Sequence, residues 1–469
     1  MKNNKSVPNF RASIGLALWL AAFAAAASPS DAATLRVLAQ TGQYSQPYGI
    51  TEGAPGLFYF VGDVGTDIVS ITTKGYLTQV AAFQHPPYII FSAPISGSNG
   101  LFYSSIEGTQ NVNNGYVFSF TSAPGSQTYS AQSFAPAFTQ NLPDGNLLTI
   151  AYPYATTSTI LAETTLGGEV MAPIYRFPSG EQVAFDALYA TDGNYYGTSV
   201  SANKTAGYVY QITPSGSLTK LLNIPIPASA YVLQAGDGNL YGVTGSNGKP
   251  QAATIFKLTL GGQYALLHTF PAGTSGNVAM LIEGSDGKIY GATNGNGGVG
   301  SRIFSMTTSG QYAVVYEMNA NQGQCPCTLV QGSDGVVYGT AQMFGTTGGG
   351  TIFALDAGLP KPAPQAKQFQ PQSGSAGTQV QIWGSNLLSA KVTFNGVAAR
   401  DVSSSGPNYV LATVPARATS GPIMVTTPGG TSTTDASFTV QEAPQCRRKY
   451  DLDNSEFRRN RSQLRDASL

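Results

Sequence analysis

Few side chains in this sequence are of the types that perform acid-base or metal chemistry. Only two histidines are present, His85 within Gln84-His85-Pro86-Pro87 and His268 within a run of β-forming residues, far apart along the chain. A histidine-based metal site needs three or four ligands brought together, and neither histidine has a neighbouring cluster of carboxylates or cysteines. The histidines therefore predict no metal site.

Aspartate stands directly before a glycine in five of the repeats, and four of these residues are candidate metal ligands: Asp192, Asp237, Asp286 and Asp334. Loop carboxylates are calcium ligands in many proteins. Asp-Gly is also a preferred dipeptide of tight turns, because aspartate bonds to nearby backbone and glycine accepts a positive φ. The turn accounts for these aspartates, so we predict no catalytic residue, no metal and no cofactor.

The cysteines leave their own state open. Cys325 and Cys327 are separated by one proline, and Cys446 stands alone near the C-terminus. A disulfide between residues two apart is strained, whereas export would allow one of them to pair with Cys446. Free thiols are the third possibility, and a redox role is not predicted.

Tyrosines recur at a nearly fixed interval and reveal the elements that position these groups. The markers, one of them a leucine, lie 44 to 49 residues apart: Tyr59, Tyr103, Leu148, Tyr196, Tyr241, Tyr290 and Tyr338. An Asn-Gly or Asp-Gly dipeptide precedes six of the seven, which predicts two-residue hairpin turns. We expect the aromatic markers to pack between neighbouring repeats; stacking platforms for sugar rings are the alternative.

Each repeat holds four short β-forming runs. In the fifth copy, the run before Asp237 and the tyrosine run are followed by Thr254–Leu258 and, after Leu260-Gly261-Gly262, by 264–270. Repeats of roughly 40 to 50 residues with four strands each are typical of propeller blades. The sequence thus predicts an all-β fold with a seven-bladed β-propeller over residues 33–358.

The seventh copy is one strand short. It runs from Cys327 to Leu355 and stops at Ala357-Gly358-Leu359-Pro360, whereas residues 34–40 have the period-2 pattern of a last strand. A propeller must pair its first and last blades or leave open edges. We predict that residues 34–40 form the outermost strand of the seventh blade.

Residues 1–32 read as a secretory signal peptide, with a positive leader at Lys2, Lys5 and Arg11, an apolar core and a small-residue end at Ser30-Asp31-Ala32. The apolar run is short for a membrane helix, so we expect a secreted or cell-surface protein without a membrane span. The formal net charge is zero, which argues against nucleic acid as a partner. We expect a monomer.

Composition changes after the repeats. Residues 359–365 form a proline-rich linker, and 442–469 form a charged tail that we expect to be disordered. Between them, residues 366–441 carry alternating apolar runs separated by Gly, Asn and Pro: 380–383, 391–394, 410–414 and 423–426. This pattern predicts a small immunoglobulin-like β-sandwich.

The repeat unit, Asp-Gly-x-Leu-Tyr-Gly followed by a Gly-rich loop and Thr-Ile-Phe-x-Leu, resembles the GloVer tandem repeats of secreted bacterial proteins over residues 48–356. The C-terminal module is similar to IPT/TIG immunoglobulin-like domains at Trp383-Gly384-Ser385-Asn386-Leu387 and Thr427-Pro428-Gly429-Gly430-Thr431. Both resemblances imply an extracellular setting, and neither brings catalytic residues. The blade layout is also similar to virginiamycin B lyase-like propellers, but that family carries Trp in the strand after the turn, and here Trp19 and Trp383 both lie outside the repeats.

Two functions remain as alternatives. The first is a non-catalytic exported protein with a binding or adhesive role, whose ligand is a glycan or a protein. The second is a propeller enzyme, a lyase or hydrolase, with an extracellular substrate. We expect either site in the central channel or on the face of the variable loops, which are 106–115, 200–207, 245–254, 294–301 and 342–350. The sequence predicts no individual ligand-binding residue.

Overall fold

The computed structural model describes residues 33–441 apart from short segments at 43, 63–64, 84–87, 91, 109–114, 133, 154–157, 184–186, 202–205, 225–231, 245–252, 272–277, 279–280, 295–299 and 405. The predicted leader, the predicted tail with Cys446, His85 and parts of four variable loops therefore lie outside the described residues. The described part contains strands and short 3-10 turns such as η2 (Ala320–Gln322) but no α-helix, so the all-β prediction is confirmed.

Seven antiparallel sheets of four or five strands follow one another over the described part of residues 34–356. The first four sheets are β2 (Tyr48–Ala54), β3 (Leu57–Gly62), β4 (Asp67–Thr72) and β5 (Leu77–Ala82); β6 (Tyr88–Ile90), β7 (Ile95–Ser96), β8 (Phe102–Gly108), β9 (Gly115–Phe120) and β10 (Thr128–Gln132); β11 (Phe134–Asn141), β12 (Leu147–Pro153), β13 (Ile160–Thr164) and β14 (Tyr175–Arg176); and β15 (Gln182–Val183), β16 (Leu188–Tyr189), β17 (Tyr195–Val200), β18 (Gly207–Ile212) and β19 (Leu218–Ile224).

The fifth to seventh sheets match the repeat most regularly. They are β20 (Val232–Gln234), β21 (Leu240–Thr244), β22 (Thr254–Leu258) and β23 (Tyr264–Thr269); β24 (Ile282–Glu283), β25 (Ile289–Thr293), β26 (Arg302–Met306) and β27 (Tyr312–Glu317); and β28 (Gln324–Gln331), β29 (Val337–Met343) and β30 (Thr351–Asp356) with β1 (Thr34–Gln40). Each sheet contains one repeat, apart from the seventh, which takes its outer strand from the start of the chain.

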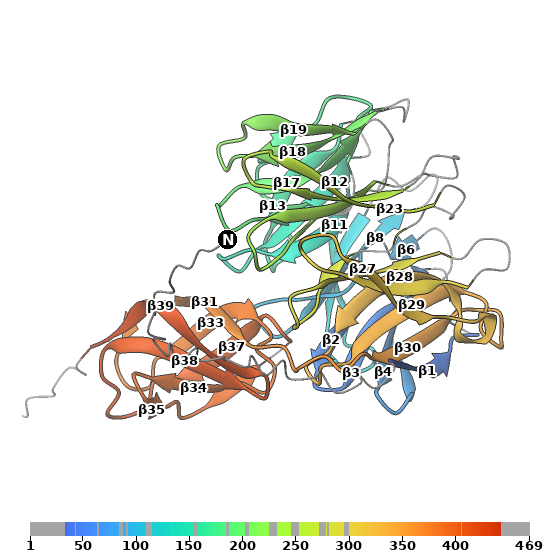
Figure 1. The fold of residues 1–469 in the computed structure, drawn as a ribbon. Coiled ribbons are helices and arrows are strands. Elements are labelled where there is room, and N and C mark those ends of the chain that lie inside the picture. Colours follow the sequence, from blue (N-terminus) through green and yellow to red (C-terminus); the bar gives the residue numbers. More distant parts are fainter. Residues whose placement is uncertain are drawn as a thin grey trace, which may run out of the picture.

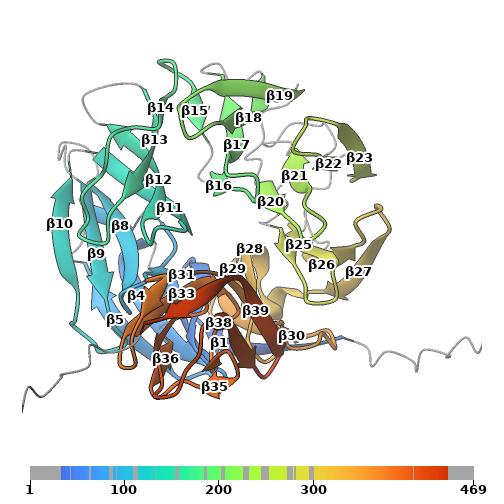
Figure 2. The ribbon, with the colours of Figure 1, turned by 90° about the vertical axis from the view of Figure 1, so that its left-hand side faces the viewer.

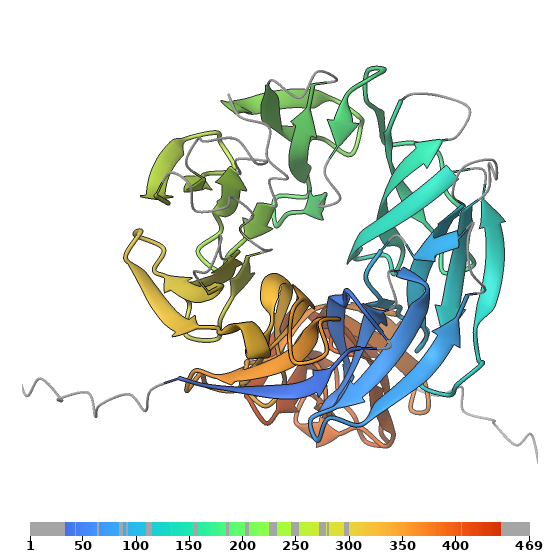
Figure 3. The ribbon, with the colours of Figure 1, turned by 90° about the vertical axis from the view of Figure 1, so that its right-hand side faces the viewer.

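The seven sheets lie in a ring, with strands such as β11, β16 and β20 toward the centre and β10, β19 and β23 toward the outside (Figures 2 and 3). Every neighbouring pair of sheets shares a cluster of buried apolar side chains, including the seventh and the first, where Tyr338 and Ile352 meet Phe58 and Phe60. Burial of apolar surface is the main favourable contribution to folding. The ring is therefore stabilised chiefly by the contacts between neighbouring sheets.

β1 lies at the outer edge of the seventh sheet, in the place where the sequence puts residues 34–40. It pairs antiparallel with β30 from Thr34 opposite Asp356 to Gln40 opposite Thr351, with one irregularity between Val37 and Ala39. The Gln40 side chain also accepts the N–H of Thr346 at 2.9 Å. The two ends of the repeat region are therefore joined within one sheet.

The Asp-Gly hairpins differ from the predicted two-residue form. In the fifth sheet, Gly238 donates to the carbonyl of Ala235 at 2.9 Å, and Ala235 donates to the carbonyl of Asn239 at 3.0 Å. Three residues therefore form the loop, and of these only Gly238 has a positive φ, at 80°. A type I turn followed by a left-handed glycine needs one such residue, whereas a two-residue type I′ turn needs two, and aspartate is spared that conformation.

The C-terminal module consists of two sheets around one apolar core. One sheet contains β31 (Gln365–Gln370), β33 (Gln379–Ser385), β37 (Tyr409–Thr413) and β36 (Val402–Ser404); the other contains β32 (Ser373–Gly374), β39 (Gly430–Val440), β38 (Gly421–Thr427), β34 (Lys391–Phe394) and β35 (Val397–Ala398). Phe369 and Ile382 from the first sheet pack with Phe394 and Phe438 from the second. The module thus buries a core of its own.

The segment between the ring and the module is bound along its length. Leu359 packs against the apolar cluster of the sixth and seventh sheets, and the carbonyl of Pro360 accepts hydrogen bonds from Gln331 Nε2 at 3.1 Å and from Ser285 Oγ. Beyond it, the module lies against the face of the ring that carries the Asp-Gly turns (Figures 1 and 2). The module therefore covers part of the turn face.

Candidate functional site

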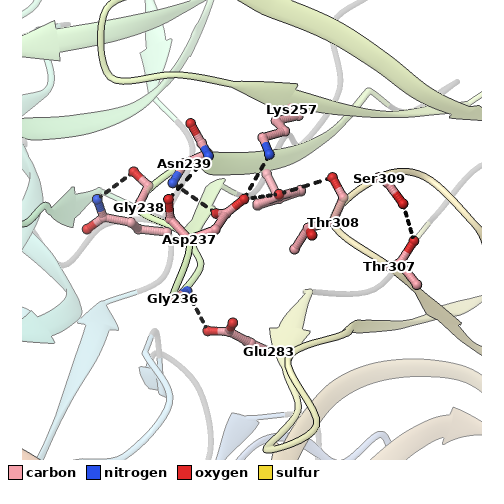
Figure 4. A network of polar contacts seen from close by, with 11 residues as sticks. Gly236, Asp237, Gly238, Asn239, Lys257, Glu283, Thr307, Thr308 and Ser309 are labelled. Atoms are coloured by element: carbon pink, nitrogen blue, oxygen red, sulfur yellow. Dashed lines mark hydrogen bonds and ion pairs between the residues drawn. The ribbon is translucent and has the colours of Figure 1, made fainter. Parts of the chain in front are cut away.

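The aspartates of the Asp-Gly turns each hold several groups at once, as Figure 4 shows for Asp237. Asp237 Oδ1 accepts the N–H of Asn239 at 3.1 Å, while Oδ2 accepts the hydroxyl of Tyr241 at 2.7 Å and Lys257 Nζ at 2.8 Å. Burial disfavours the charged form of Asp237, but these hydrogen bonds outweigh it and hold its pKa below the ordinary value. Asp237 thus lies in the turn as predicted, and its carboxylate is an ionised acceptor that already takes three hydrogen bonds.

The bond between aspartate and marker tyrosine is repeated around the ring. It joins Asp192 to Tyr196, Asp286 to Tyr290 and Asp334 to Tyr338. The rings themselves lie between sheets, because Tyr59, Tyr103, Tyr196, Tyr241 and Tyr338 are all buried within clusters shared by two sheets. The expectation that the markers pack between repeats is confirmed, and these tyrosines are closed to a ligand.

A second repeated contact links neighbouring sheets at the same turns. The backbone N–H five residues before a marker donates to a Gln or Glu side chain seven residues before the next marker: Thr191 to Gln234 (3.0 Å), Gly236 to Glu283 (2.8 Å), Ser285 to Gln331 (2.9 Å) and Ser333 to Glu52 (2.7 Å). We call these four bonds the latches. The last of them joins the seventh sheet to the first.

The Glu283 latch gives a test of stability against pH. Burial raises the pKa of Glu283, and the N–H of Gly236 offsets this only in part. A carboxyl with a raised pKa binds its proton more tightly in the folded state, so the fold loses stability as pH rises from the ordinary glutamate value through the raised one. In two other sheets the latch is a glutamine, which also donates Nε2 to a glycine carbonyl, as Gln234 does to Gly238.

We therefore expect Glu283→Gln to keep or raise the melting temperature at neutral pH and Glu283→Ala to lower stability by about 1 kcal/mol, the worth of a hydrogen bond. As pH rises from about 4, the ordinary glutamate value, through the raised pKa of Glu283, the wild type should lose stability relative to Glu283→Gln. Scanning calorimetry across this range measures both effects. A glutamine variant no more stable than the alanine variant at neutral pH would show that the latch contributes nothing.

The third sheet departs from the repeat at one residue pair. Leu148 stands in place of the tyrosine and faces Glu163 across the strands, where Tyr241 faces Lys257 in the fifth sheet. The third sheet therefore has two carboxylates beside its turn and no lysine.

These two carboxylates, Asp144 and Glu163, share one donor. Asn146 Nδ2 donates to Asp144 Oδ2 at 2.7 Å and to Glu163 Oε2 at 3.3 Å, and the hydroxyl of Tyr195 donates to Glu163 Oε1 at 3.2 Å. Burial, and then the charge of Asp144, raise the pKa of Glu163. The sequence reasoning missed this pair, although the loss of the marker tyrosine at Leu148 is a visible signal for it.

The histidine and cysteines in the described part are packed among neighbours. His268 stacks on Tyr312 of the next sheet, with ring centroids 4.1 Å apart and planes 8° apart. Cys325 and Cys327 are free thiols; Cys327 Sγ contacts Thr340 Oγ1 at 3.1 Å, and burial raises its pKa to about 11. Over the residues that the structure covers, no three potential metal-ligating groups come together, and no helix has the length and apolar character to cross a bilayer.

A cavity of about 680 Å³ lies where the module meets the turns of the third and fourth sheets. The ring contributes Asn141 and Tyr189, and the module contributes Gln368, Trp383 and Asn408. A second cavity of about 280 Å³ lies between the module and the first and seventh sheets, and Asn408 lines both. Binding sites commonly lie at domain interfaces and have volumes of roughly 300 to 1,000 Å³, so the larger cavity is the candidate site.

Trp383 is the main aromatic contribution of the module. It lies in β33, is only 8% exposed, and reaches the Asp144-Gly145 turn of the third sheet. Its indole Nε1 has no hydrogen-bond partner among the described residues. The tryptophan that the sequence places outside the repeats thus packs against the ring and forms one wall of the cavity.

The cavity is located where the latch pattern is broken. The positions seven residues before the markers hold Asn141 in the third sheet and Tyr189 in the fourth, in place of the Gln or Glu of the latches. Here Gln140, one position earlier, bonds to the backbone N–H of Tyr189 at 2.8 Å instead. Among the described residues, the Asn141 amide and the Tyr189 hydroxyl have no hydrogen-bond partner, so both are available to a ligand.

Sequence reasoning placed a site on the opposite, loop-bearing face or in the channel, and it nominated no residue. Four of those loops lie partly outside the described residues, so the loop face stays a prediction. The turn-face cavity was missed because it needs a residue from the module beside residues of the ring. The sequence does carry a signal for the ring side of the cavity. At the position seven residues before the marker, Asn141 and Tyr189 differ from Gln234 and Gln331.

Comparison with known proteins agrees with the repeat architecture. A sequence model of the Gloeobacter/Verrucomicrobia repeat matches residues 182–406, and no curated protein matches the chain. Among solved structures, a streptogramin B lyase is similar with 16% identity over 70% of this chain and 98% of that one, at a TM-score of 0.51. An oligogalacturonate lyase in complex with manganese has 12% identity over 70% and 93%, at 0.45. At such identities the likeness concerns the fold: the chain is a repeat protein with a propeller-like fold.

Proposed function

We propose that this protein is a non-catalytic exported binding protein, in which a seven-bladed β-propeller of GloVer repeats and a C-terminal IPT/TIG-type module hold a ligand between them. The signal-like residues 1–32 support export to the surface or the exterior. The shared apolar cluster between the seventh and first sheets supports closure of the propeller.

The observation that carries the binding role is the composition of the larger cavity between the ring and the module, which we call the junction cavity. Among its described lining residues the one carboxylate is Asp192, which accepts the hydroxyl of Tyr196 at 2.7 Å and the N–H of Asn194 at 3.1 Å. Although burial opposes it, these bonds lower the pKa of Asp192, so this group is a poor proton donor or acceptor near neutral pH. A hydrolase or lyase site needs a base and an electrophilic partner held together, whereas the remaining described lining offers mainly amides, hydroxyls and aromatic rings, with Lys367 as an exposed cation.

A parallel screen tests this proposal. The purified protein is applied to glycan, cell-wall and protein arrays, and the same preparation is assayed for product formation from polysaccharides and peptides. We expect retention of a ligand without turnover. Product formation that disappears when one carboxylate of the ring is replaced would overturn the binding role in favour of the enzyme.

A further inference from the structure

We infer that the junction cavity binds a neutral oligosaccharide, recognised jointly by the ring and the module. This rests on the proposed binding function and names the ligand class of that site. The occupied and unoccupied hydrogen-bonding groups of the lining carry the inference, together with its aromatic walls and its charge.

The lining separates into side chains that are committed and side chains that are free. Gln234 is committed, because it accepts the N–H of Thr191 at 3.0 Å and donates to Gly238 at 3.1 Å. Asn141, Tyr189 and Asn408 are free, because none of their side chains has a hydrogen-bond partner in the described part of the chain. Two carboxamides and a phenol offer donors and acceptors together, which matches hydroxyl groups, since these also donate and accept.

Aromatic rings supply the second half of the match. Trp383 and Tyr189 line the cavity from opposite partners, the module and the ring. Such rings are large apolar surfaces with a polar edge. A pyranose has the complementary form, because its C–H faces are apolar and its hydroxyls project from the rim.

The charge of the cavity selects against ionic ligands. Among the described residues that line it, Lys367 is the one cation and is exposed, and Asp192 is the one anion and is bonded within the turn. An anionic sugar or a nucleotide needs a fork of arginines or several lysines, and this lining has neither. A neutral sugar chain leaves no charge unpaired on entering the cavity.

The chain provides its own probe for this site. The sequence has two tryptophans, Trp19 and Trp383, so a protein that starts at residue 33, and keeps every described residue, has Trp383 as its sole indole. We would titrate this protein with neutral hexasaccharides of glucose, xylose, mannose or N-acetylglucosamine, and in parallel with oligogalacturonate and with a peptide library. The expected result is a saturable change in Trp383 emission with at least one neutral sugar.

Variants locate the binding. Asn141→Ala and Asn408→Ala should each weaken binding by about tenfold, since each leaves a sugar hydroxyl without its partner, and their melting temperatures should stay near that of the wild type. Asn223→Ala is the matched control, because Asn223 is an exposed asparagine on the outer strand β19. Calorimetry of the same titrations measures binding independently of Trp383.

The outcomes separate the site from the function. Sugar binding that both variants retain at full strength would overturn the cavity as its place, with the binding function intact. Binding of peptides or oligogalacturonate in preference to neutral sugars would overturn the ligand class alone. Conversion of the sugar to product would overturn the proposed function itself.

Discussion

Deletion of residues 33–41 is expected to lower the melting temperature by about 10 °C and to give aggregates that the full-length protein does not form. β1 pairs with β30 over most of its length and partly covers Leu35 and Leu38. The loss of a strand's backbone hydrogen bonds and apolar contacts costs on the order of 4 kcal/mol, and a chain of this size loses a few degrees per kcal/mol. The exposed edge of β30 is then free to pair with another molecule.

The measurement combines scanning calorimetry with light scattering on gel-filtered protein. Deletion of 442–450, which removes the same number of residues outside the described part of the chain, serves as the control. A truncated protein that stays monomeric and melts within a few degrees of the wild type would show that β1 is dispensable, and that closure depends on the apolar cluster around Phe58 and Tyr338 and on the Glu52 latch.

The strands were predictable because their signal is local and repeated. Thr254–Leu258 and Lys391–Phe394 have the boundaries that the sequence pattern indicates. The third sheet has the shortest outer strand of the seven, Tyr175–Arg176, and its copy of the repeat is the one that has Leu148 in place of the marker tyrosine. Repetition makes a weak pattern reliable, because the pattern can be compared over several copies. The prediction fails where a copy diverges.

The candidate site was not predictable in the same way. Its aromatic wall, Trp383, lies almost two hundred residues from Tyr189, and only the docking of the module on the turn face brings them to one cavity. Docking depends on tertiary contacts such as those of Pro360 with Gln331 and Ser285, which leave no periodic trace. The sequence does show one exception: Asn141 stands in the position where other sheets have the Gln or Glu that forms a latch.

The hydrogen bonds of Asp237 should account for the second large effect. We expect Asp237→Ala to reduce the free energy of unfolding by about 3 kcal/mol, because it removes the turn acceptor and leaves the buried hydroxyl of Tyr241 without a strong partner. The nearest remaining acceptor, the carbonyl of Thr308, is 3.5 Å from that hydroxyl (Figure 4). Lys257 also loses its ion pair, a partly exposed contact of small worth.

The third sheet offers the matched control. Asp144 occupies the same turn position and accepts the N–H of Asn146 at 3.0 Å, but Leu148 gives it no tyrosine hydroxyl to accept. Asp144→Ala should therefore lower the free energy of unfolding by about 1 kcal/mol. Removing the Asp144 charge also ends its repulsion of the Glu163 carboxylate, which reduces this cost. The difference between the two variants is then dominated by the bond from aspartate to tyrosine, with smaller contributions from the Lys257 ion pair and from the charge beside Glu163.

The lowered pKa of Asp237 determines how its contribution to the free energy of unfolding changes with pH. Because the pKa of Asp237 is lowered in the folded protein, its contribution is fully present above the ordinary aspartate pKa of about 4 and is lost as pH falls through the lowered value. Urea unfolding of the wild type and both variants should thus show the Asp237→Ala deficit at neutral pH and its progressive loss in acid. Equal costs for the two alanine variants at neutral pH would mean that the tyrosine hydroxyl contributes nothing, and that the recurrence of tyrosine around the ring rests on the packing of its aromatic face alone.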